Sequence, residues 1–196
     1  FLTMNSSSIR SQIRQQRCSL DLHERQQAAA WISSEILRSP LFMKAKHIAI
    51  YLSNDGEIDL SSVFHTAWQR NKHCYLPVLN KYGKKLSFAP YTANSIMRNN
   101  RFGIPEPVVT KREFRSPHQL DLVLAPLVAF DEQGNRMGMG GGFYDRSFSF
   151  LRRQQHWQHT RLIGTAYSFQ QVEQLPTQAW DVPLSGAFTE NGYQAF

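Results

Sequence analysis

Two segments of this chain, residues 120–128 and 162–167, are apolar on both faces, and they constrain its fold more than any other feature. A strand that is apolar on both faces must be covered on both sides, as happens in the middle of a largely parallel sheet. Four shorter strand patterns alternate with stretches of helical periodicity. The strand patterns lie at residues 47–53, 73–78, 86–91 and 187–189. The alternation predicts an α/β fold, namely a three-layer α/β/α sandwich with a mostly parallel central sheet. In such folds ligands bind at the carboxyl ends of the strands.

Two helices are expected before the first of these strands. The first helix should carry an apolar stripe beside a stripe of arginines. These stripes consist of Ile9 and Ile13, and of Arg10, Arg14 and Arg17. Asp21 followed by Glu24 has the spacing of a capping box, so the second helix should begin there and end near Leu37.

The size and composition of the chain narrow its class. Its 196 residues fit one domain, which we place at residues 4–196, leaving the residues ahead of Met4 out of the fold. Cys18 and Cys74 occur in unrelated contexts, which fits reduced thiols better than a disulfide. The sequence has neither an apolar run of about 18 residues nor a secretory leader pattern. We therefore expect a cytoplasmic monomer without a membrane partner.

The formal net charge of +7 indicates an anionic partner or a solvated basic surface. The basic residues fall in small separate groups, without the aromatic motif, zinc knuckle or long basic arm of nucleic-acid-binding proteins. This distribution favours small anionic ligands and no nucleic acid. The basic groups between residues 81 and 115, which are Lys81, Lys84, Lys85, Arg98, Arg101, Lys111, Arg112 and Arg115, are expected in loops that flank a pocket.

The segment Arg136-Met-Gly-Met-Gly-Gly-Gly-Phe-Tyr-Asp145 follows the first doubly apolar strand and opens a helical pattern. Its glycines remove the β-carbons from one side of a turn, so that backbone N–H groups can converge on an anion. Arg136 adds a positive charge, and Asp145 adds a carboxylate suited to magnesium. No lysine follows, as a P-loop requires, and Phe143 stands where a dinucleotide fingerprint has glycine. From the residues alone, a phosphate site and a tight structural turn both remain open.

Taken together, several ordered landmarks resemble the 5-formyltetrahydrofolate cyclo-ligase family over nearly the whole chain. They are Ile9-Arg-Ser-Gln-Ile-Arg14, Tyr51-Leu-Ser followed by Glu57, Phe102-Gly-Ile-Pro-Glu-Pro107, the glycine segment ending in Tyr-Asp, and Asp181 before the last strand. The resemblance implies that ATP and 5-formyltetrahydrofolate become 5,10-methenyltetrahydrofolate, ADP and phosphate, with magnesium as cofactor. It also implies an N5-iminium phosphate intermediate.

The resemblance implies a role for particular residues. ATP would contact Arg10, Ser11, Gln12, Ile13 and Arg14, together with Arg136, Met137, Gly138, Met139, Gly140, Gly141, Gly142, Phe143 and Tyr144. The folate, which the family can carry as a polyglutamate, would contact Leu52, Glu57, Met139, Gly140, Gly141, Gly142 and Phe143. Asp145 and Asp181 would hold magnesium, and Arg136 and Asp145 would act in catalysis. Glu57 would accept hydrogen bonds from the donor edge of the pterin.

The chain also departs from the family pattern. Ser185 stands where members commonly have a second aspartate, and Trp180 stands where a histidine is frequent, which weakens the metal assignment of Asp181. Arg14 could form a surface ion pair, and Glu57 could be a solvated turn residue. Three other functions remain: an RNA-binding module, a different enzyme on a similar α/β scaffold such as a sugar-phosphate isomerase or a CoA-transferase relative, and a folate-binding member without turnover.

Overall fold

The computed structural model describes residues 5–79, 84–100, 103–152 and 159–196. Within these ranges the main sheet has seven strands. From one edge to the other they are β11 (Gly192–Ala195), β10 (Gly186–Thr189), β9 (Arg161–Thr165), β6 (Leu122–Pro126), β1 (His47–Ala49), β2 (His73–Leu79) and β3 (Leu86–Pro90). The inner strands are parallel, and only the edge strands β11 and β3 are antiparallel to their neighbours. The predicted mostly parallel sheet is confirmed, with the two doubly apolar segments, β6 and β9, side by side near its centre.

The strand order changes direction between β1 and β6. From β1 the chain adds β2 on one side, whereas β6, β9 and β10 extend the sheet on the other side. A crevice forms at such a switch point, beyond the carboxyl ends of the two strands, and ligands bind there in open α/β sheets. The segment after β1 contains Glu57, and the segment after β6 leads into the glycine turn. The topology therefore brings the two predicted ligand segments to the same edge of the sheet.

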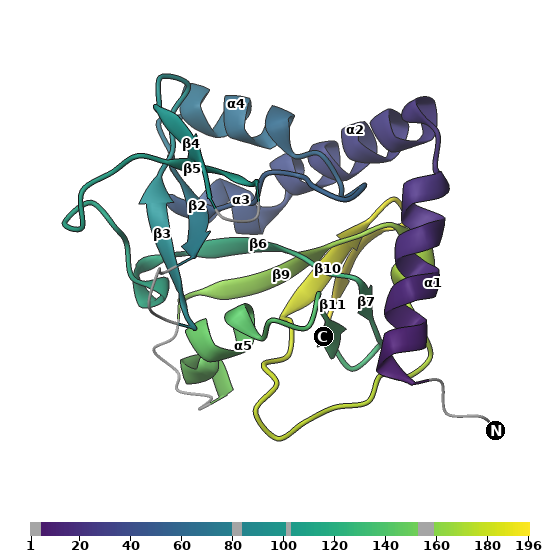
Figure 1. Cartoon of the computed structure of the whole chain (residues 1–196). Coiled ribbons are helices and arrows are strands. Elements are labelled where there is room, and N and C mark those ends of the chain that lie inside the picture. The colour runs from purple at the N-terminus through teal and green to yellow at the C-terminus, as the bar shows by residue number, and fades with distance from the viewer. Residues whose placement is uncertain (1–4, 80–83, 101–102, 153–158) are drawn as a thin grey trace.

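Helices cover the two faces of the sheet unequally (Figure 1). One face is covered by α2 (Leu22–Arg38), α3 (Pro40–Lys44) and α4 (Ser61–Gln69), whose apolar side chains share a core with β1, β2, β6 and β9. The other face is covered by short elements: α5 (Phe143–Ser147) and the 3₁₀ helices η1 (Pro117–Gln119) and η2 (Ser149–Arg152). The sandwich thus has three layers, but the layer that carries the glycine motif is thin. The helix that the motif opens has five residues.

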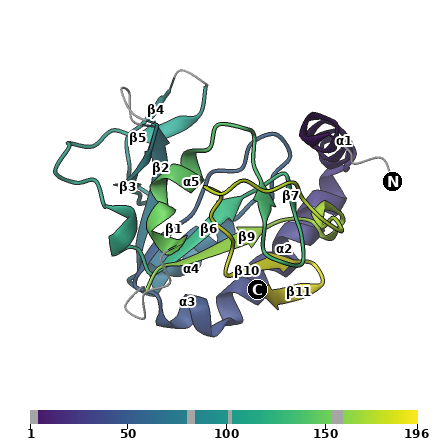
Figure 2. The same ribbon diagram turned by 90° about the horizontal axis from the view of Figure 1, so that it is seen from below.

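The helix α1 (Ser6–Ser19) packs on a small hairpin and not on the main sheet. This hairpin consists of β7 (Ala129–Phe130) and β8 (Arg136–Met137), and Figure 2 shows α1 beside it at one side of the molecule. Ile9 and Ile13 lie in one apolar cluster with Val128, Ala129, Met137 and Leu175. The buried Asp131 shapes the hairpin turn by accepting hydrogen bonds from the amides of Gln133 and Asn135. Through this packing, α1 is fixed next to the residues that precede the glycine turn.

Several local predictions are confirmed, and a few elements were not predicted. The capping box of α2 is present, with bonds of 2.8 Å between Asp21 and Glu24 in both directions. The strands β4 (Met97–Asn99) and β5 (Pro105–Pro107) form a hairpin where only loops were expected, and η3 (Ser168–Gln170) follows β9. Lys81, Arg101 and Phe102, which entered the sequence argument, lie outside the described residues, as does Met4. None of the helices in the described ranges is long and apolar enough to cross a membrane.

Candidate active site

The glycine turn, residues 138–142, is fixed by two arginine side chains that bind its carbonyl groups. Arg10 on α1 donates from Nε to the carbonyl oxygen of Gly138 at 2.9 Å. Arg146 on α5 donates to the carbonyl of Gly141 and, at 2.7 Å, to that of Lys84. Within the described part of the chain, the amide groups of the turn donate no hydrogen bond. Two carbonyls of the turn are therefore bound by side chains, while the N–H groups remain available to an anion.

Backbone geometry explains why the turn needs glycine. Gly140 has a φ of 94° and Gly142 a φ of 59°, which are conformations that side chains disfavour. Gly138 has no such φ, and a β-carbon there would meet no atom within 4 Å. The space beside Gly138 is therefore open, so that packing within the protein does not explain the absence of a side chain there.

Arg136 and Asp145, at the two ends of the glycine motif, form an ion pair. Nη2 of Arg136 donates to Oδ1 of Asp145 at 2.7 Å, and Nη1 donates to the carbonyl of Val182. The amide of Val182 in turn donates to the same Asp145 oxygen at 3.1 Å. The Arg136 side chain is 6% exposed, and its burial lowers its pKa, an effect that Asp145 and the nearby Asp181 oppose. Arg136 therefore ties β8, α5 and the segment before the last strands into one unit.

Two predicted metal ligands, Asp145 and Asp181, thus lie near one guanidinium group. Asp145 uses Oδ1 for Arg136 and Val182, and Asp181 uses Oδ2 to accept from the amide of Gln178 at 2.8 Å. No group of three or more histidine, cysteine or acidic side chains that could hold a metal occurs among the described residues. The protein can therefore offer a cation two carboxylates at most here, and other ligands would have to complete the coordination.

Glu57, in the segment after β1, lies close to the glycine motif. Its Oε2 accepts a hydrogen bond of 3.1 Å from the amide of Asn54. Burial raises the pKa of both Tyr51 and Tyr144, and the nearby charge of Glu57 raises each further. Burial raises the pKa of Glu57 to about 7, against a smaller lowering by Arg17. The structure therefore brings a predicted folate residue next to Tyr144, and it makes Glu57 a poorly solvated carboxyl group instead of a solvated turn residue.

The arginine stripe of α1 differs from the prediction. Arg17 is buried, with 1% of its side chain exposed, and it donates to Asp55 at 2.7 Å and to the carbonyl of Leu127 at 3.3 Å. Arg14 is 44% exposed and binds the same carboxylate through Nε at 2.7 Å and Nη2 at 3.1 Å. Helical spacing could not reveal that Asp55, from a distant turn, compensates a charge buried under α1. Of the three arginines predicted to form a basic stripe on α1, only Arg10 and Arg14 are therefore accessible on its surface.

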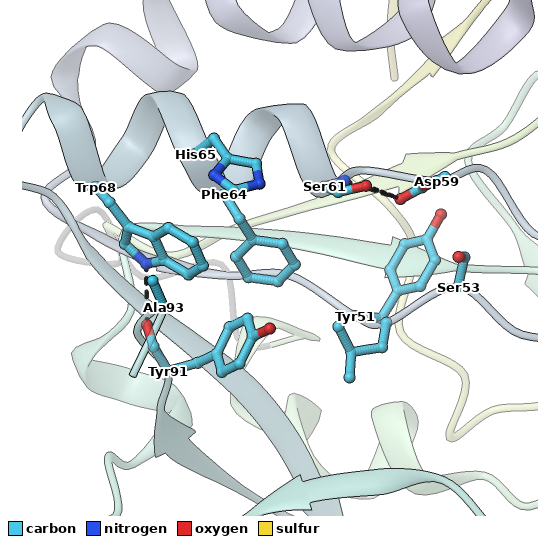
Figure 3. A pocket seen from close by; sticks show the side chains of 10 residues that line it. Tyr51, Ser53, Asp59, Ser61, Phe64, His65, Trp68, Tyr91 and Ala93 are labelled. Atoms are coloured by element: carbon cyan, nitrogen blue, oxygen red, sulfur yellow. Dashed lines mark hydrogen bonds between the residues drawn. The ribbon is translucent and has the colours of Figure 1, made fainter. Parts of the chain in front are cut away.

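A cavity of about 420 Å³, which we call the aromatic pocket, opens beside the predicted folate residue Leu52 (Figure 3). It is lined by Tyr51, Leu52, Ser53, Asp59, Ser61, Phe64, His65, Trp68, Tyr91 and Ala93. The ring of Phe64 meets that of Tyr91 edge to face at 5.0 Å, and Trp68 donates to the carbonyl of Tyr91 at 3.0 Å. Phe64 and Trp68 are four positions apart on α4 and therefore share one side of the helix, a pattern that does not distinguish a pocket wall from a core.

A second cavity, of about 410 Å³, lies at the C-terminal end of the glycine motif, where Gly142 and Asp145 line it. It is lined by Lys85, Gly142, Asp145, Arg146, Ser149, Arg152 and Trp180. Most of its charged groups are basic, and we call it the basic cavity. The exposed ring of Trp180 lies at its wall. Lys85 lies far from Arg146 and Arg152 in the sequence, and only the fold shows that all three line one cavity with Asp145.

Some of the other residues that were predicted to contact the ligands have exposed side chains, and others have buried ones. Ser11 and Gln12 are exposed on α1, and Met139 is 57% exposed at the tip of the turn. Ile13 and Met137 are buried in the cluster between α1 and the hairpin. The side chains of Ile13 and Met137 therefore hold α1 against the hairpin and do not face the turn's open side.

Comparisons with known proteins agree with this geometry. The model of the 5-formyltetrahydrofolate cyclo-ligase family matches residues 3–190. The chain belongs to this family. It is 42% identical to the 5-formyltetrahydrofolate cyclo-ligase of Haemophilus influenzae over 185 residues, which cover 93% of this chain and 96% of that protein. It is 38% identical to the cyclo-ligase of Escherichia coli K12 over 180 residues, covering 90% and 96% of the two chains.

Solved structures of related proteins share the fold of this cyclo-ligase family member. The NMR structure of 5,10-methenyltetrahydrofolate synthetase from Aquifex aeolicus superposes with a TM-score of 0.81 at 32% identity, covering 98% of this chain and 93% of that one. The synthetase from Mycoplasma pneumoniae superposes with a TM-score of 0.74 at 25% identity, covering 95% and 99% of the two chains. The similarity therefore extends over the whole α/β unit and includes every segment of the candidate site.

Proposed function

We propose that this chain is an ATP-dependent 5-formyltetrahydrofolate cyclo-ligase, which converts 5-formyltetrahydrofolate to 5,10-methenyltetrahydrofolate with release of ADP and phosphate. One observation supports this most: the glycine turn has two carbonyls bound by arginine side chains and its amides unused among the described residues, and its motif lines a basic cavity and is within electrostatic range of Glu57. A phosphate donor and a folate can thus meet at one turn. Family membership supplies the identity of the two substrates.

In this proposal the nucleotide phosphates bind the amides of the glycine turn. Arg10 keeps its two terminal nitrogens for phosphate, because only its Nε is used on Gly138. Lys85 and Arg152 add positive charge in the basic cavity. Phosphoryl transfer needs little covalent help from a protein and depends on positioning and charge neutralisation, which such donors provide.

Magnesium is part of the proposal, and the donor set fits it. Mg²⁺ usually binds one or two protein carboxylates together with substrate phosphate oxygens and water. Asp145 has Oδ2 for this purpose, since its recorded bonds all use Oδ1, and Asp181 is the second candidate ligand. When bound, the ion would neutralise charge on the phosphates. Removal of magnesium by a chelator should abolish turnover, and full activity in its absence would contradict this part of the proposal.

The folate is proposed to bind at the switch point, with its pterin near Glu57 and Leu52. A carboxylate there can accept hydrogen bonds from the N–H groups of a pterin. The aromatic pocket beside Leu52 offers rings for a flat ligand to stack against. The glycine turn would border the formyl group, since the reacting oxygen must lie close to the γ-phosphorus.

The chemistry then needs two steps. The formyl oxygen attacks the γ-phosphorus, the bond to the β-phosphate oxygen breaks, and ADP leaves, giving an N5-iminium phosphate. N10 attacks the activated carbon, loses its proton, and expels phosphate as the five-membered ring closes. The turn amides and Arg10 hold the transferred phosphoryl group, while Glu57 holds the pterin so that N10 can reach the carbon.

Absorbance at the methenyl-folate band tests the proposal directly. The protein is mixed with 5-formyltetrahydrofolate and magnesium, with and without ATP. We expect an increase that requires ATP; no increase from folded protein would refute the activity. ATP dependence also separates this enzyme from a sugar-phosphate isomerase or a CoA-transferase, because neither reaction consumes a nucleotide.

Three further properties are proposed with the activity: a cytoplasmic location, a monomeric state, and acceptance of polyglutamylated folate. Arg115, Lys111 and Arg112 lie in the basic region that we expected to attract the glutamate tail. Charge reversal there should weaken the binding of polyglutamylated substrate more than that of monoglutamate. Equal affinity of the variant and the unmodified protein for polyglutamate would rule this role out.

A further inference from the structure

Asp55 is the point at which α1 meets the segment that carries Glu57. Its carboxylate accepts three bonds from two arginines of α1: two from Arg14, at 2.7 and 3.1 Å, and one from Arg17, at 2.7 Å. We call these three residues the Asp55 clamp. Glu57 follows two positions later in the chain. The clamp therefore connects the helix of the proposed nucleotide site with a carboxylate of the proposed folate site.

On the helix side, the clamp determines which atoms of Arg14 stay available. Asp55 binds Nε and Nη2, which is the side-on arrangement of a guanidinium and a carboxylate. Within the described residues no partner is recorded for Nη1 of Arg14. A bidentate pair fixes the plane of the guanidinium, so Nη1 points in a defined direction. Arg14 is thus held in one orientation with a donor left over for a phosphate.

On the loop side, the clamp fixes the backbone just before Glu57. Asp55 and Gly56 both have positive φ values, 53° and 72°. A β-carbon at Gly56 would lie 3.1 Å from the carbonyl oxygen of Arg17, so the loop runs directly against α1. Tyr167 also donates to the carbonyl of Gly56 at 3.2 Å. Little freedom remains for the Glu57 carboxylate to move relative to the helix.

The buried Arg17 indicates that this arrangement serves more than packing. Its side chain is 1% exposed, and its Nε has no hydrogen-bond partner, although both Nη atoms are bonded. A buried ion pair is often no more stabilising than apolar side chains of similar volume, and its best-attested use is to specify one geometry. Asp55 stays ionised because the hydrogen bond from Arg14 and, less strongly, that from Arg17 lower its pKa to about 2. The clamp is therefore a permanent connection at physiological pH.

We propose that Asp55 is a positioning residue for both substrates: it aligns Arg14 towards the nucleotide phosphates and, through its own loop, Glu57 towards the folate. This inference rests on the proposed function. Asp55 itself touches neither ligand. A residue that only stabilised the fold would affect unfolding and leave both affinities intact, whereas a positioning residue affects both affinities in protein that is fully folded.

The test is Asp55→Asn, with Glu35→Gln as the matched control. Asparagine tolerates a positive φ and has the same size, so the substitution removes the charge and leaves the backbone acceptable. Glu35 forms an exposed ion pair with Arg38 on α2, far along the chain from the site. Dissociation constants are measured for a non-hydrolysable ATP analogue and for 5-formyltetrahydrofolate, with a thermal melt of each variant. We expect Asp55→Asn to weaken both ligands about tenfold, as for a lost charged hydrogen bond, and the control to bind as the unmodified protein.

Two outcomes would overturn the inference: affinities of Asp55→Asn within twofold of the unmodified protein, or a change confined to one ligand. If Asp55→Asn does not fold, Arg17→Lys replaces it, because lysine keeps the charge but has one ammonium group in place of the two terminal nitrogens that bind Asp55 and Leu127 separately. Weakened binding of both ligands would support the clamp, and unchanged binding would refute it. Failure of the proposed function is distinguishable, since it would appear in the unmodified protein as ligand binding without ATP-dependent methenyl formation.

Discussion

Glu57→Gln should stabilise this protein at neutral pH while it impairs folate binding. Burial raises the pKa of Glu57 to about 7 from its ordinary 4.5, so the folded protein holds the proton more tightly than the unfolded chain does. Between pH 4.5 and about 7 the unfolded chain therefore binds fewer protons than the folded protein does. The free energy of unfolding of the unmodified protein falls as the pH rises through this range. Glutamine does not titrate, and its side-chain oxygen can still accept from the amide of Asn54.

The magnitude follows from the pKa values. At about 1.4 kcal/mol per pKa unit, raising the pKa from 4.5 to about 7 corresponds to about 3 kcal/mol at full ionisation. The Glu57 side chain is only partly buried, and water screens part of the effect, so we expect a gain of about 1 to 3 kcal/mol at pH 8. For a chain of this size such a gain raises the melting temperature by roughly 2 to 10 °C. The gain should shrink towards pH 5, where the carboxyl group is largely protonated in the folded protein.

The assay is chemical or thermal unfolding of the unmodified protein, Glu57→Gln and Glu35→Gln between pH 5 and 8, together with folate binding. The stability difference for Glu57→Gln should grow with pH, and the surface control should show no such trend. Folate affinity should fall, because an amide cannot replace a carboxylate that accepts two hydrogen bonds. A stability difference that does not change with pH would show that Glu57 is not poorly solvated, and the reasoning would fail.

Three other substitutions or labels test separate parts of the site. Asp145→Asn retains Oδ1 as an acceptor for Arg136, so we expect a loss of about 2 kcal/mol in stability but at least a hundredfold loss of turnover, and near-normal turnover would refute its role. Gly138→Ala meets no atom within 4 Å, so stability should stay within about 0.5 kcal/mol while ATP affinity falls; unchanged affinity would place the phosphates elsewhere. Alkylation of folded protein should modify the exposed Cys18 and spare Cys74, whose pKa burial raises to about 12, and labelling of both at equal rates would contradict this.

Much of the fold could be predicted from the sequence because its main signals are local. The doubly apolar segments that became β6 and β9 required burial on both faces, and Asp21 with Glu24 marked the start of α2. The missed strands are two to four residues long and depend on tertiary pairing, so no periodicity could identify them. Glycine content located the turn that we propose as the phosphate site, and because the helix after it has only five residues, an anion there would depend on the turn amides more than on a long helix dipole.

The partners of charged side chains could not be predicted. Arg17 has the same helical spacing as Arg10 and Arg14, yet it is buried against Asp55, which is 38 positions away. Likewise, Arg136 and Asp145 are separated by nine positions, but only the fold shows that they bind each other and Val182. Long-range pairing of this kind leaves no trace in spacing or composition. The sequence therefore indicated which residue types belong to the site, and the structure decided which of their charges are already neutralised.

Which arginine charges are already neutralised by carboxylates affects how the triphosphate would be bound. Arg136 is compensated by Asp145, while Arg14 and Arg17 share the single carboxylate of Asp55, so two of the three positive charges are opposed and one remains on the Arg14–Arg17 pair. Among the described residues, the donors available to phosphate are the terminal nitrogens of Arg10, Nη1 of Arg14, the amides of the glycine turn and the basic groups of the second cavity. Amide donors on a fixed turn need no reorganisation when charge moves from ATP to the formyl oxygen, which is the condition for stabilising a transition state. In the proposed mechanism, the Arg136–Asp145 ion pair holds the end of the glycine motif in place, and the neutral backbone amides would supply much of the electrostatic stabilisation.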